Sequence, residues 1–375
     1  MEKKSVFGLV IVIILLSSLV ALGCAAPAPA PAPSPAPSPA PADSVEVYKW
    51  TVQSQWPATH LHHLEFAKAF EQIKIASNGR LVPTVHSTNE VVPFYEEYKA
   101  VKEGTIDAAF CGGDEWRAVL GQKANLIGGT GVPGGPSVEE YMAHFYQGNG
   151  MKLSNDLYGD WGEVVGAMGI CTEIFCHSNK ILATAEDFKG VKFRSAGTWG
   201  DILSEYYGAS VVHISGGEVY QSAEKGVIDA FEYGTPCVNW PMGFHQIMSY
   251  LGLPGIHSPA GLALCVVNNQ SWAELPDDLQ KIIFEVFMAR GYDGLMYQHH
   301  QDGQALQNFK DYGTEIFRVD EGFQRDIIEK SKEFHMGFYD EDPKFKLIWD
   351  DMEAFSKAYK QHAEVSTSIN MFDID

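Results

Sequence analysis

Hydrophobic and polar positions in the first third of the chain alternate between two periods. A period of two over Val47–Gln53, an extended run over Leu81–His86 and an apolar run over Ile106–Phe110 predict three strands. Apolar residues at helical spacing predict a helix over Leu61–Ile75, and a second helix is expected from Pro93 up to a glycine stop before the third strand. This βαβαβ order predicts a mainly parallel sheet.

The last helix and strand of that lobe have a counterpart further along the chain. Residues 100–108 (Ala-Val-Lys-Glu-Gly-Thr-Ile-Asp-Ala) align with residues 222–230 (Ser-Ala-Glu-Lys-Gly-Val-Ile-Asp-Ala). Each copy reads as a short helix, a glycine stop and a strand. We therefore expect two lobes of similar build, each with a strand end at a shared cleft.

The remaining pattern predicts how these lobes are joined. Two β-rich stretches, residues 164–181 and 257–268, are expected to cross between them, and a helical pattern runs from Leu279 towards Tyr312 with interruptions at two glycines. A strand and two amphipathic helices are expected at 315–319, 321–338 and 343–364. The predicted fold class is α/β: a two-lobed fold with two mixed sheets and helices, whose hinge consists of crossing strands and a long interlobe helix.

These elements set the expected domain boundaries. Lobe 1 comprises residues 44–165 and 258–312. Lobe 2 comprises residues 166–257 and 313–375, including the C-terminal helices.

The segment before lobe 1 reads as a targeting signal. Residues 1–23 have a basic start and an apolar stretch that ends in Val-Ala-Leu-Gly before Cys24, which looks like a bacterial lipobox with Cys24 as the lipidated residue. The alternative, an uncleaved membrane helix, is disfavoured because the apolar stretch is short and a proline tract follows it. Residues 24–43, rich in Ala, Pro and Ser, are expected to form an extended tether.

Composition and charge narrow the class of partner. The 375-residue chain is 45% hydrophobic and carries a net charge of −21, which argues against nucleic acid and anionic membrane surfaces. An anionic ligand would therefore need a local cation to hold it. Five cysteines remain besides Cys24, none in a Cys-x-x-Cys pattern, and we expect them to be buried small hydrophobic residues.

That local cation is expected at Arg194. It ends a predicted strand over residues 191–194, a Gly-Gly-Glu turn at 216–218 opens a short helix, and the strand around Ala230 leads to Glu232. Open α/β sheets bind ligands at the carboxyl ends of their strands. A guanidinium there, with no nucleophile or base in the same run, suits binding an anion rather than transforming one.

The ordered motifs resemble those of the extracytoplasmic solute-binding subunits of TRAP transporters, the tripartite ATP-independent carriers of organic acids. The matching segments are Gly-Val-Lys-Phe-Arg at 190–194, Gly-Gly-Glu-Val-Tyr at 216–220, Glu-Lys-Gly-Val-Ile-Asp-Ala at 224–230 and Asn-Gln-Ser-Trp-Ala-Glu-Leu-Pro at 269–276. Shorter matches at 78–81 and 102–107 extend the likeness over most of the folded chain. The Glu-aromatic pair after Ile-Asp-Ala is most similar to the branch that binds 2-oxo and 2-hydroxy acids.

The resemblance implies a periplasmic-binding-protein-like form of the two-lobed fold and roles for particular residues. Arg194 would hold the carboxylate of the ligand through two hydrogen bonds. Glu232 would bind a cation that also touches the ligand, and Tyr233, where those members commonly have Trp, would supply a backbone carbonyl. The branch's glutamine ligand has no clear counterpart, with Thr172 and Glu173 standing nearby. The metal set is thus Glu232, Tyr233 and Glu173, which suits Ca²⁺ or Na⁺ better than zinc, and the alternative is that Glu232 accepts a hydrogen bond from the ligand.

Two tryptophans are further candidates for contact with the ligand. Trp56 follows the first strand and Trp116 follows the third, where loops of lobe 1 should close over the cleft. The alternative for both is packing at the rim or in the core. Trp199 is expected in the core.

Other chemistries have little support in the sequence. The histidines in His60-Leu-His62-His63 and His299-His300 have no zinc-ligand spacing, and we interpret them as solvated helix residues. No nucleophile elbow, phosphate loop or dinucleotide fingerprint occurs.

The predicted function is that of a membrane-anchored, extracytoplasmic solute-binding lipoprotein, in the periplasm or at the cell surface. It would capture a small organic acid for the membrane permease of a TRAP transporter, with no catalytic residues and no required cofactor, and the sequence leaves a homodimer open. The alternatives are an ABC-type or sensory binding protein, and a secreted enzyme on the same two-lobed scaffold.

Overall fold

The computed structural model describes residues 46–366. The expected signal peptide, tether and lipidation site at Cys24 lie outside the described residues. Within the described range, no helix combines the length and the apolar character needed to cross a bilayer.

The first sheet is mixed and has the order β2-β1-β3-β10-β4. Its strands are β1 (Tyr48–Ser54), β2 (Leu81–His86), β3 (Ala108–Cys111), β4 (Glu163–Ile170) and β10 (Gly261–Val267). β1 runs parallel to both β2 and β3, which confirms the βαβαβ prediction, and β10 runs antiparallel to β3 and β4.

The second sheet is also mixed and has the order β11-β9-β5-β8-β6-β7. Its strands are β5 (Cys176–Ser178), β6 (Lys192–Arg194), β7 (Ser210–Val212), β8 (Ala230–Phe231), β9 (Tyr250–Leu253) and β11 (Glu315–Arg318). β6 lies between β7 and β8 and is parallel to both, so Arg194 and the residue that follows Phe231 come out at the same edge of the sheet.

Strand β10 shows why the first sheet is buried on both faces. Its sequence is an uninterrupted apolar run, and successive side chains of a strand point to opposite faces. Leu262, Leu264 and Val266 therefore join one hydrophobic cluster, and the residues between them join another. Both clusters are covered by helices.

The short helices of the fold connect and cover these strands. They are α1 (Leu61–Ala76), α2 (Glu97–Glu103), α3 (Arg117–Leu120), α4 (Gln122–Gly128), α5 (Val138–Gln147), α6 (Gly150–Tyr158), α7 (Gly197–Tyr207), α8 (Val219–Glu224), α9 (Pro236–Asn239) and α10 (Asn269–Ala273). The helix expected from Pro93 begins only at Glu97, because Tyr95 has a left-handed φ of 66° that ends any helical turn before it.

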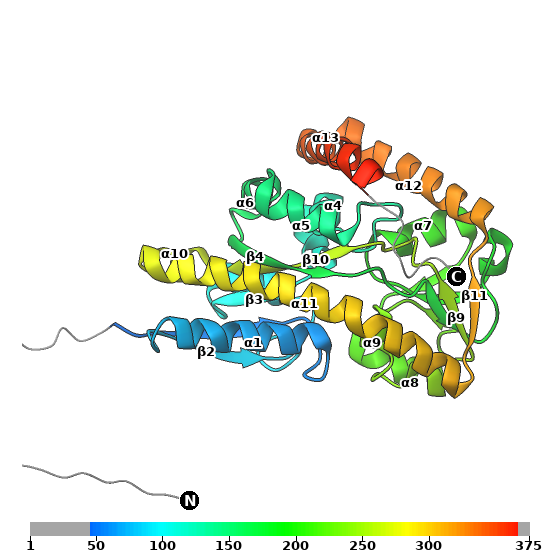
Figure 1. Ribbon diagram of the computed structural model, residues 1–375, viewed down its shortest axis with the longest axis horizontal. Coiled ribbons are helices and arrows are strands. Elements are labelled where there is room, and N and C mark those ends of the chain that lie inside the picture. The colour runs from blue at the N-terminus through cyan, green and yellow to red at the C-terminus, as the bar shows by residue number, and fades with distance from the viewer. Residues whose placement is uncertain (1–45, 367–375) are drawn as a thin grey trace, which may run out of the picture. The chain divides into compact units, whose positions relative to one another are not determined.

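One long helix, α11 (Asp277–Tyr312), connects the two sheets. It packs on β4 of the first sheet and on α9 beside the second, and Figure 1 shows it in yellow and orange along both. The interruptions expected at its glycines do not occur. Gly291 instead permits close packing, since a Cβ there would lie 2.8 Å from the Ala167 carbonyl oxygen.

The two stretches expected to cross do run from one sheet to the other. In the run over residues 164–181, β4 ends at Ile170 in the first sheet and β5 begins at Cys176 in the second. The chain returns from β9 of the second sheet to β10 of the first through residues 254–260.

The five described cysteines form no disulfide, and four of them are buried, with Cys237 half-buried.

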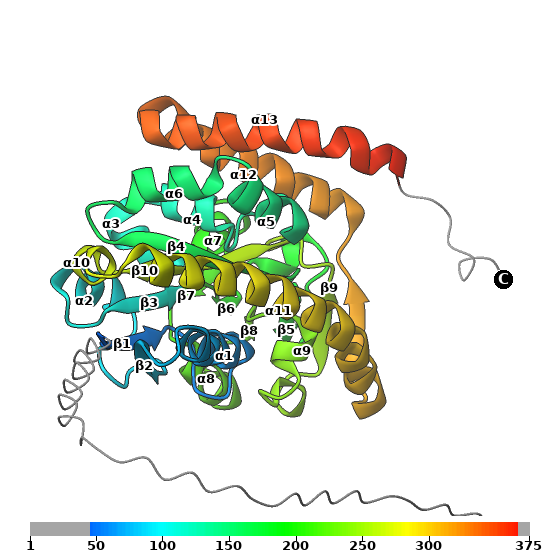
Figure 2. The ribbon, with the colours of Figure 1, turned by 60° about the vertical axis from the view of Figure 1, so that its left-hand side comes forward.

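The expected boundary of lobe 2 is wrong for the last helix. α12 (Glu321–Glu341) packs on α7, but α13 (Pro343–Ser366) returns over α4, α5 and α6 beside the first sheet (Figure 2). Its Phe345, Ile348 and Met352 join a hydrophobic cluster of the first lobe. A hydrogen bond between His144 Nε2 and Asp351 Oδ2, at 2.7 Å, adds to the same contact. An amphipathic pattern predicts a buried face but not which surface covers it.

Candidate functional site

A cavity of about 70 Å³ lies where strand ends of both sheets meet. Residues that follow β1 and β3 form one wall, and residues that follow β6 and β8 form the other. The crossing segments between the sheets contribute Glu173 and His257. The prediction that charged side chains gather at carboxyl ends of strands is confirmed for Arg194 and Glu232.

Arg194 is 5% exposed and lines the cavity. Its Nε donates to the Ile214 carbonyl at 3.2 Å, and its Nη1 donates to the Glu232 carbonyl at 3.1 Å and, more weakly, to Glu232 Oε2 at 3.4 Å. Nη2 has no hydrogen-bond partner in residues 46–366. These bonds fix the guanidinium at the cavity wall and leave one of its nitrogens for a ligand.

Glu232 directly follows β8 and is as buried as Arg194. Its Oε1 accepts a 2.5 Å hydrogen bond from the Ala196 amide, and Oε2 faces Arg194. Burial raises the pKa of Glu232 above its usual value, although the Arg194 charge acts in the opposite direction. The carboxylate is thus held in place by the backbone with one oxygen only loosely engaged.

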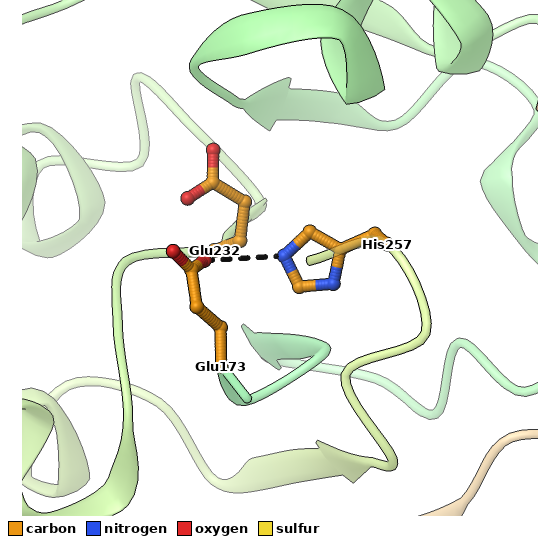
Figure 3. Close-up of side chains that lie close together, drawn as sticks. All are labelled: Glu173, Glu232 and His257. Atoms are coloured by element: carbon orange, nitrogen blue, oxygen red, sulfur yellow. Dashed lines mark hydrogen bonds and ion pairs between the residues drawn. The ribbon is translucent and has the colours of Figure 1, made fainter. Parts of the chain in front are cut away.

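Glu173 and His257 complete a second cluster with Glu232 (Figure 3). Glu173 Oε2 lies 3.3 Å from His257 Nε2, and one potential ligand atom from each of the three residues lies within 4.8 Å of the others. The Glu173 amide also donates to the Ser258 carbonyl at 3.1 Å, which ties the two crossing segments together. Two carboxylates and an imidazole so placed can bind a metal ion.

The cluster agrees only partly with the expected metal set. Glu232 and Glu173 lie together as the resemblance implied, and Tyr233 lines the cavity with them. Thr172, the other neighbour considered, is exposed, and its hydroxyl donates to the Pro259 carbonyl at 2.8 Å. His257 was not expected, because its position 84 residues from Glu173 gives no local motif.

The histidines at the start of α1 are not solvated, so that prediction is wrong for this group. His60 and His62 line the cavity and are 3% and 7% exposed. His60 caps α1 by accepting a hydrogen bond from the His62 amide at 3.2 Å. Burial lowers the pKa of His60, and it lowers that of His62 to about 4, so both rings are neutral near pH 7. Their place at the start of the helix that follows the carboxyl end of β1 is the sequence signal for this position.

The surface histidine pair behaves as predicted. His299 on α11 is exposed, and its Nε2 lies 3.0 Å from Glu139 Oε1. His300 beside it is exposed as well.

Of the two candidate tryptophans, one lines the cavity and one does not. Trp56 lies against His60 in a stacked arrangement, with ring centroids 5.8 Å apart, and lines the cavity. Trp116 is fully buried beside Tyr158 in the core and does not line the cavity, which agrees with the alternative of core packing. The short 3₁₀ turn over Gly113–Trp116 directs the indole inward.

The same turn presents Asp114 to the cavity instead. Its Oδ2 accepts a hydrogen bond from the Tyr95 hydroxyl at 3.2 Å. Burial raises the pKa of Asp114, and the hydrogen bond from Tyr95 partly offsets this rise.

Trp199, the third tryptophan considered, is in the core as predicted.

Comparison with known proteins gives a consistent set of relatives. Residues 52–342 match the model of the bacterial extracellular solute-binding proteins, family 7 (DctP). The monocarboxylate 2-oxoacid-binding periplasmic protein all3028 of Nostoc is 24% identical over 316 residues, which covers 82% of this chain and 84% of that protein.

Solved structures share the fold. A TRAP periplasmic solute-binding protein from Colwellia psychrerythraea with bound calcium and pyruvate has a TM-score of 0.79 and 27% identity, covering 86% of this chain and 98% of that one. Another, from Pseudoalteromonas atlantica with bound sodium and pyruvate, has a TM-score of 0.78 and 25% identity, covering 86% and 100%. The predicted α/β architecture of two mixed sheets is confirmed.

Proposed function

Because the chain belongs to family 7 of the bacterial extracellular solute-binding proteins, we propose that it captures a small organic acid anion for a TRAP-type membrane permease. The ligand is a 2-oxo or 2-hydroxy monocarboxylate, or a closely related carboxylate. The chain binds and delivers this acid without transforming it.

The observation that carries the proposal is the arrangement of Arg194. The guanidinium is buried at the cavity wall, fixed by two backbone carbonyls, and keeps Nη2 without a partner in the described chain. In a molecule of net charge −21, such a site attracts an anion only through this local charge. A carboxylate that accepts a hydrogen bond from Nη2 would satisfy the guanidinium.

The size of the cavity favours a compact acid. A single water needs roughly 10–15 Å³ of cavity, so a cavity of about 70 Å³ favours an acid of a few carbons over a large sugar acid. The relatives with bound pyruvate support the same class.

The same two relatives contain a bound cation as well as pyruvate, calcium in one and sodium in the other, which supports a cation in this site. In this chain the cation would lie at Glu232 and Glu173, next to the acid held by Arg194. It would draw one oxygen of the acid towards the carboxylates and so fix the orientation of the acid. Tyr233 would contribute its backbone carbonyl to the cation and its ring to the cavity wall.

The two lobes would close around the ligand about the crossing segments and α11. In this proposal lobe 1 comprises residues 44–165 and 258–312 together with α13. Lobe 2 comprises residues 166–257 and 313–342. Lipidation at Cys24 and a tether over residues 24–43 would hold the closed protein near its permease outside the cytoplasm.

Titration calorimetry with pyruvate, lactate, 2-oxobutyrate, succinate and sialic acid tests the proposal. We expect stoichiometric binding of one or more of the short monocarboxylates, with no chemical change of the acid by NMR. Loss of this binding in Arg194→Ala is expected as well. Turnover of a bound acid, or undiminished binding by Arg194→Ala, would contradict the proposal.

A further inference from the structure

We propose that the cation in this cavity is a divalent transition metal, bound directly by the imidazole of His257 together with the carboxylates of Glu173 and Glu232. The inference rests on the proposed function, because it concerns the same cavity. It replaces the expectation of Ca²⁺ or Na⁺, which came from a ligand set of oxygen atoms alone.

The first argument is the chemistry of the ligand atoms. Imidazole nitrogen is a ligand for Zn²⁺, Ni²⁺, Cu²⁺ and iron, whereas Ca²⁺ and Na⁺ are held by oxygen atoms. His257 Nε2 is the atom that faces the cluster, at 3.3 Å from Glu173 Oε2 (Figure 3). Transition metals bind such atoms at ~2.0–2.2 Å, which puts neighbouring ligand atoms about 3.0–3.4 Å apart. The His257–Glu173 separation lies in this range, and Glu232 adds a potential ligand atom within 4.8 Å of the other two.

The second argument is that His257 cannot easily turn away. It is 1% exposed, and its ring packs edge-on against Phe175 at 5.6 Å and beside Trp199 at 5.8 Å. Its Nδ1 makes no hydrogen bond within residues 46–366. Packing therefore fixes the ring with Nε2 towards the carboxylates, where the neutral imidazole can bind a metal through this nitrogen.

The third argument is charge balance in the cavity. Glu173 and Glu232 face one guanidinium, that of Arg194, and His60 and His62 are neutral there. Adding one ligand carboxylate gives three negative groups against one positive group, even if Asp114 is left out. A divalent cation balances that excess of two charges, whereas Na⁺ leaves one negative charge buried without compensation.

Three protein ligands also leave room for the acid. A metal held by one nitrogen and two carboxylates keeps open positions, as catalytic zinc sites do. The carboxylate and the 2-oxo or 2-hydroxy oxygen of a short acid could fill two of them, while Arg194 binds the other carboxylate oxygen. The metal would thus bind the 2-oxo or 2-hydroxy oxygen of the acid and so select against a simple monocarboxylate, which lacks that oxygen.

The test uses the purified protein stripped of metal with chelator, titrated with Zn²⁺, Co²⁺, Ca²⁺ or Na⁺ in the absence of any organic acid. We expect Zn²⁺ and Co²⁺ to bind at least roughly tenfold more tightly than Ca²⁺, in line with nitrogen ligation. Bound Co²⁺ should show visible absorption bands that report its ligand set directly.

Two variants and one control separate the possible results. His257→Gln should abolish the preference for Zn²⁺ over Ca²⁺, and Glu173→Gln should weaken every metal, with circular dichroism showing that both remain folded. His299→Gln removes a histidine–glutamate pair on the surface, away from the cavity, and should leave metal binding unchanged.

A preference for Ca²⁺ or Na⁺ that His257→Gln leaves intact would overturn the inference while leaving the proposed function standing. Binding of the acid at full affinity by metal-free protein would also overturn the inference. In that case His257 and Glu173 would pair with each other, and the site would need no cation. Tight binding of a zwitterionic amino acid without metal would count against the metal in the same way. Failure of all acids to bind, with Zn²⁺ still bound, would instead contradict the proposed function.

Discussion

The ring of His60 lies 5.7 Å from the ring of Tyr233, so that residues attached to different sheets meet over the cavity. His60 caps α1 beside the first sheet, and Tyr233 follows β8 of the second. Because the two residues come from different lobes, this contact can form only when the lobes are together.

Replacing Tyr233 by leucine tests the contribution of this contact to binding. An aromatic pair is worth about 0.5–1.5 kcal/mol beyond its buried area, so Tyr233→Leu should weaken binding of the acid by roughly two- to tenfold. Stopped-flow fluorescence should show the change mainly as faster dissociation. Tyr220→Leu is the control, since Tyr220 lies outside the cavity with its hydroxyl on Gln246. Equal effects of both variants would show that the contact with His60 has no special role.

Arg194→Lys tests whether the shape of the guanidinium matters as well as its charge. Lysine keeps the positive charge but cannot reach two backbone carbonyls and a ligand in the same plane. Loss of a charge-assisted hydrogen bond costs about 1.5–3 kcal/mol, so calorimetry should show affinity reduced by roughly tenfold to a hundredfold.

The control for that substitution is Arg117→Lys, which changes an arginine paired with Asp201 at 2.7 Å outside the cavity. Its affinity for the acid should equal that of the unchanged protein. If Arg194→Lys bound the acid as tightly as the unchanged protein, the proposal that Arg194 needs the planar guanidinium to hold the carboxylate would be wrong.

Acidification should destabilise the protein through its buried neutral histidines. Burial lowers the pKa of His62 from 6.5 to about 4 and that of His177 to about 3. The unfolded chain therefore binds more protons than the folded chain below pH 6.5, and stability falls as the pH drops from 6.5 towards 4. For His62 the loss amounts to about 3 kcal/mol.

Denaturant unfolding between pH 4 and pH 8 measures this effect. His62→Gln should reduce the slope of unfolding free energy against pH between pH 4 and 6.5, whereas the exposed His299→Gln should leave it unchanged. A slope that is the same in both variants would contradict the assignment to His62.

The two tryptophans should separate binding from stability. Trp116→Ala empties a fully buried site and should cost about 3–5 kcal/mol of unfolding free energy, with the affinity for the acid preserved in the folded fraction. Trp56→Ala, at the half-buried cavity wall, should weaken binding more than it lowers the melting temperature. The reverse pattern would show that Trp116, and not Trp56, contributes to the ligand site.

Several features could be predicted because their causes are local. The apolar run that forms β10 predicts a strand buried on both faces, since each face receives every second residue. Arg194 ends β6 and Glu232 directly follows β8, and parallel neighbours bring such strand ends to one edge of the sheet. The order of strands and helices therefore determined the α/β class and half of the site.

The other half depended on contacts that no local pattern encodes. Glu173 and His257 are 84 positions apart and meet only because two irregular crossing segments bond to each other. Asp114 rather than Trp116 reached the cavity because a single 3₁₀ turn set their directions.

The sequence by itself determined which residues are strand, helix and apolar face, because periodicity depends on neighbours along the chain. The tertiary structure alone decided which of those faces meet, as it placed α13 on the first lobe and His257 beside Glu173. The physical reason is that the free energy of burying an apolar face depends on the area buried and not on which surface covers it. The sequence therefore shows that a face is apolar, or that a strand ends in a charged residue, but not which other part of the chain that face or residue contacts.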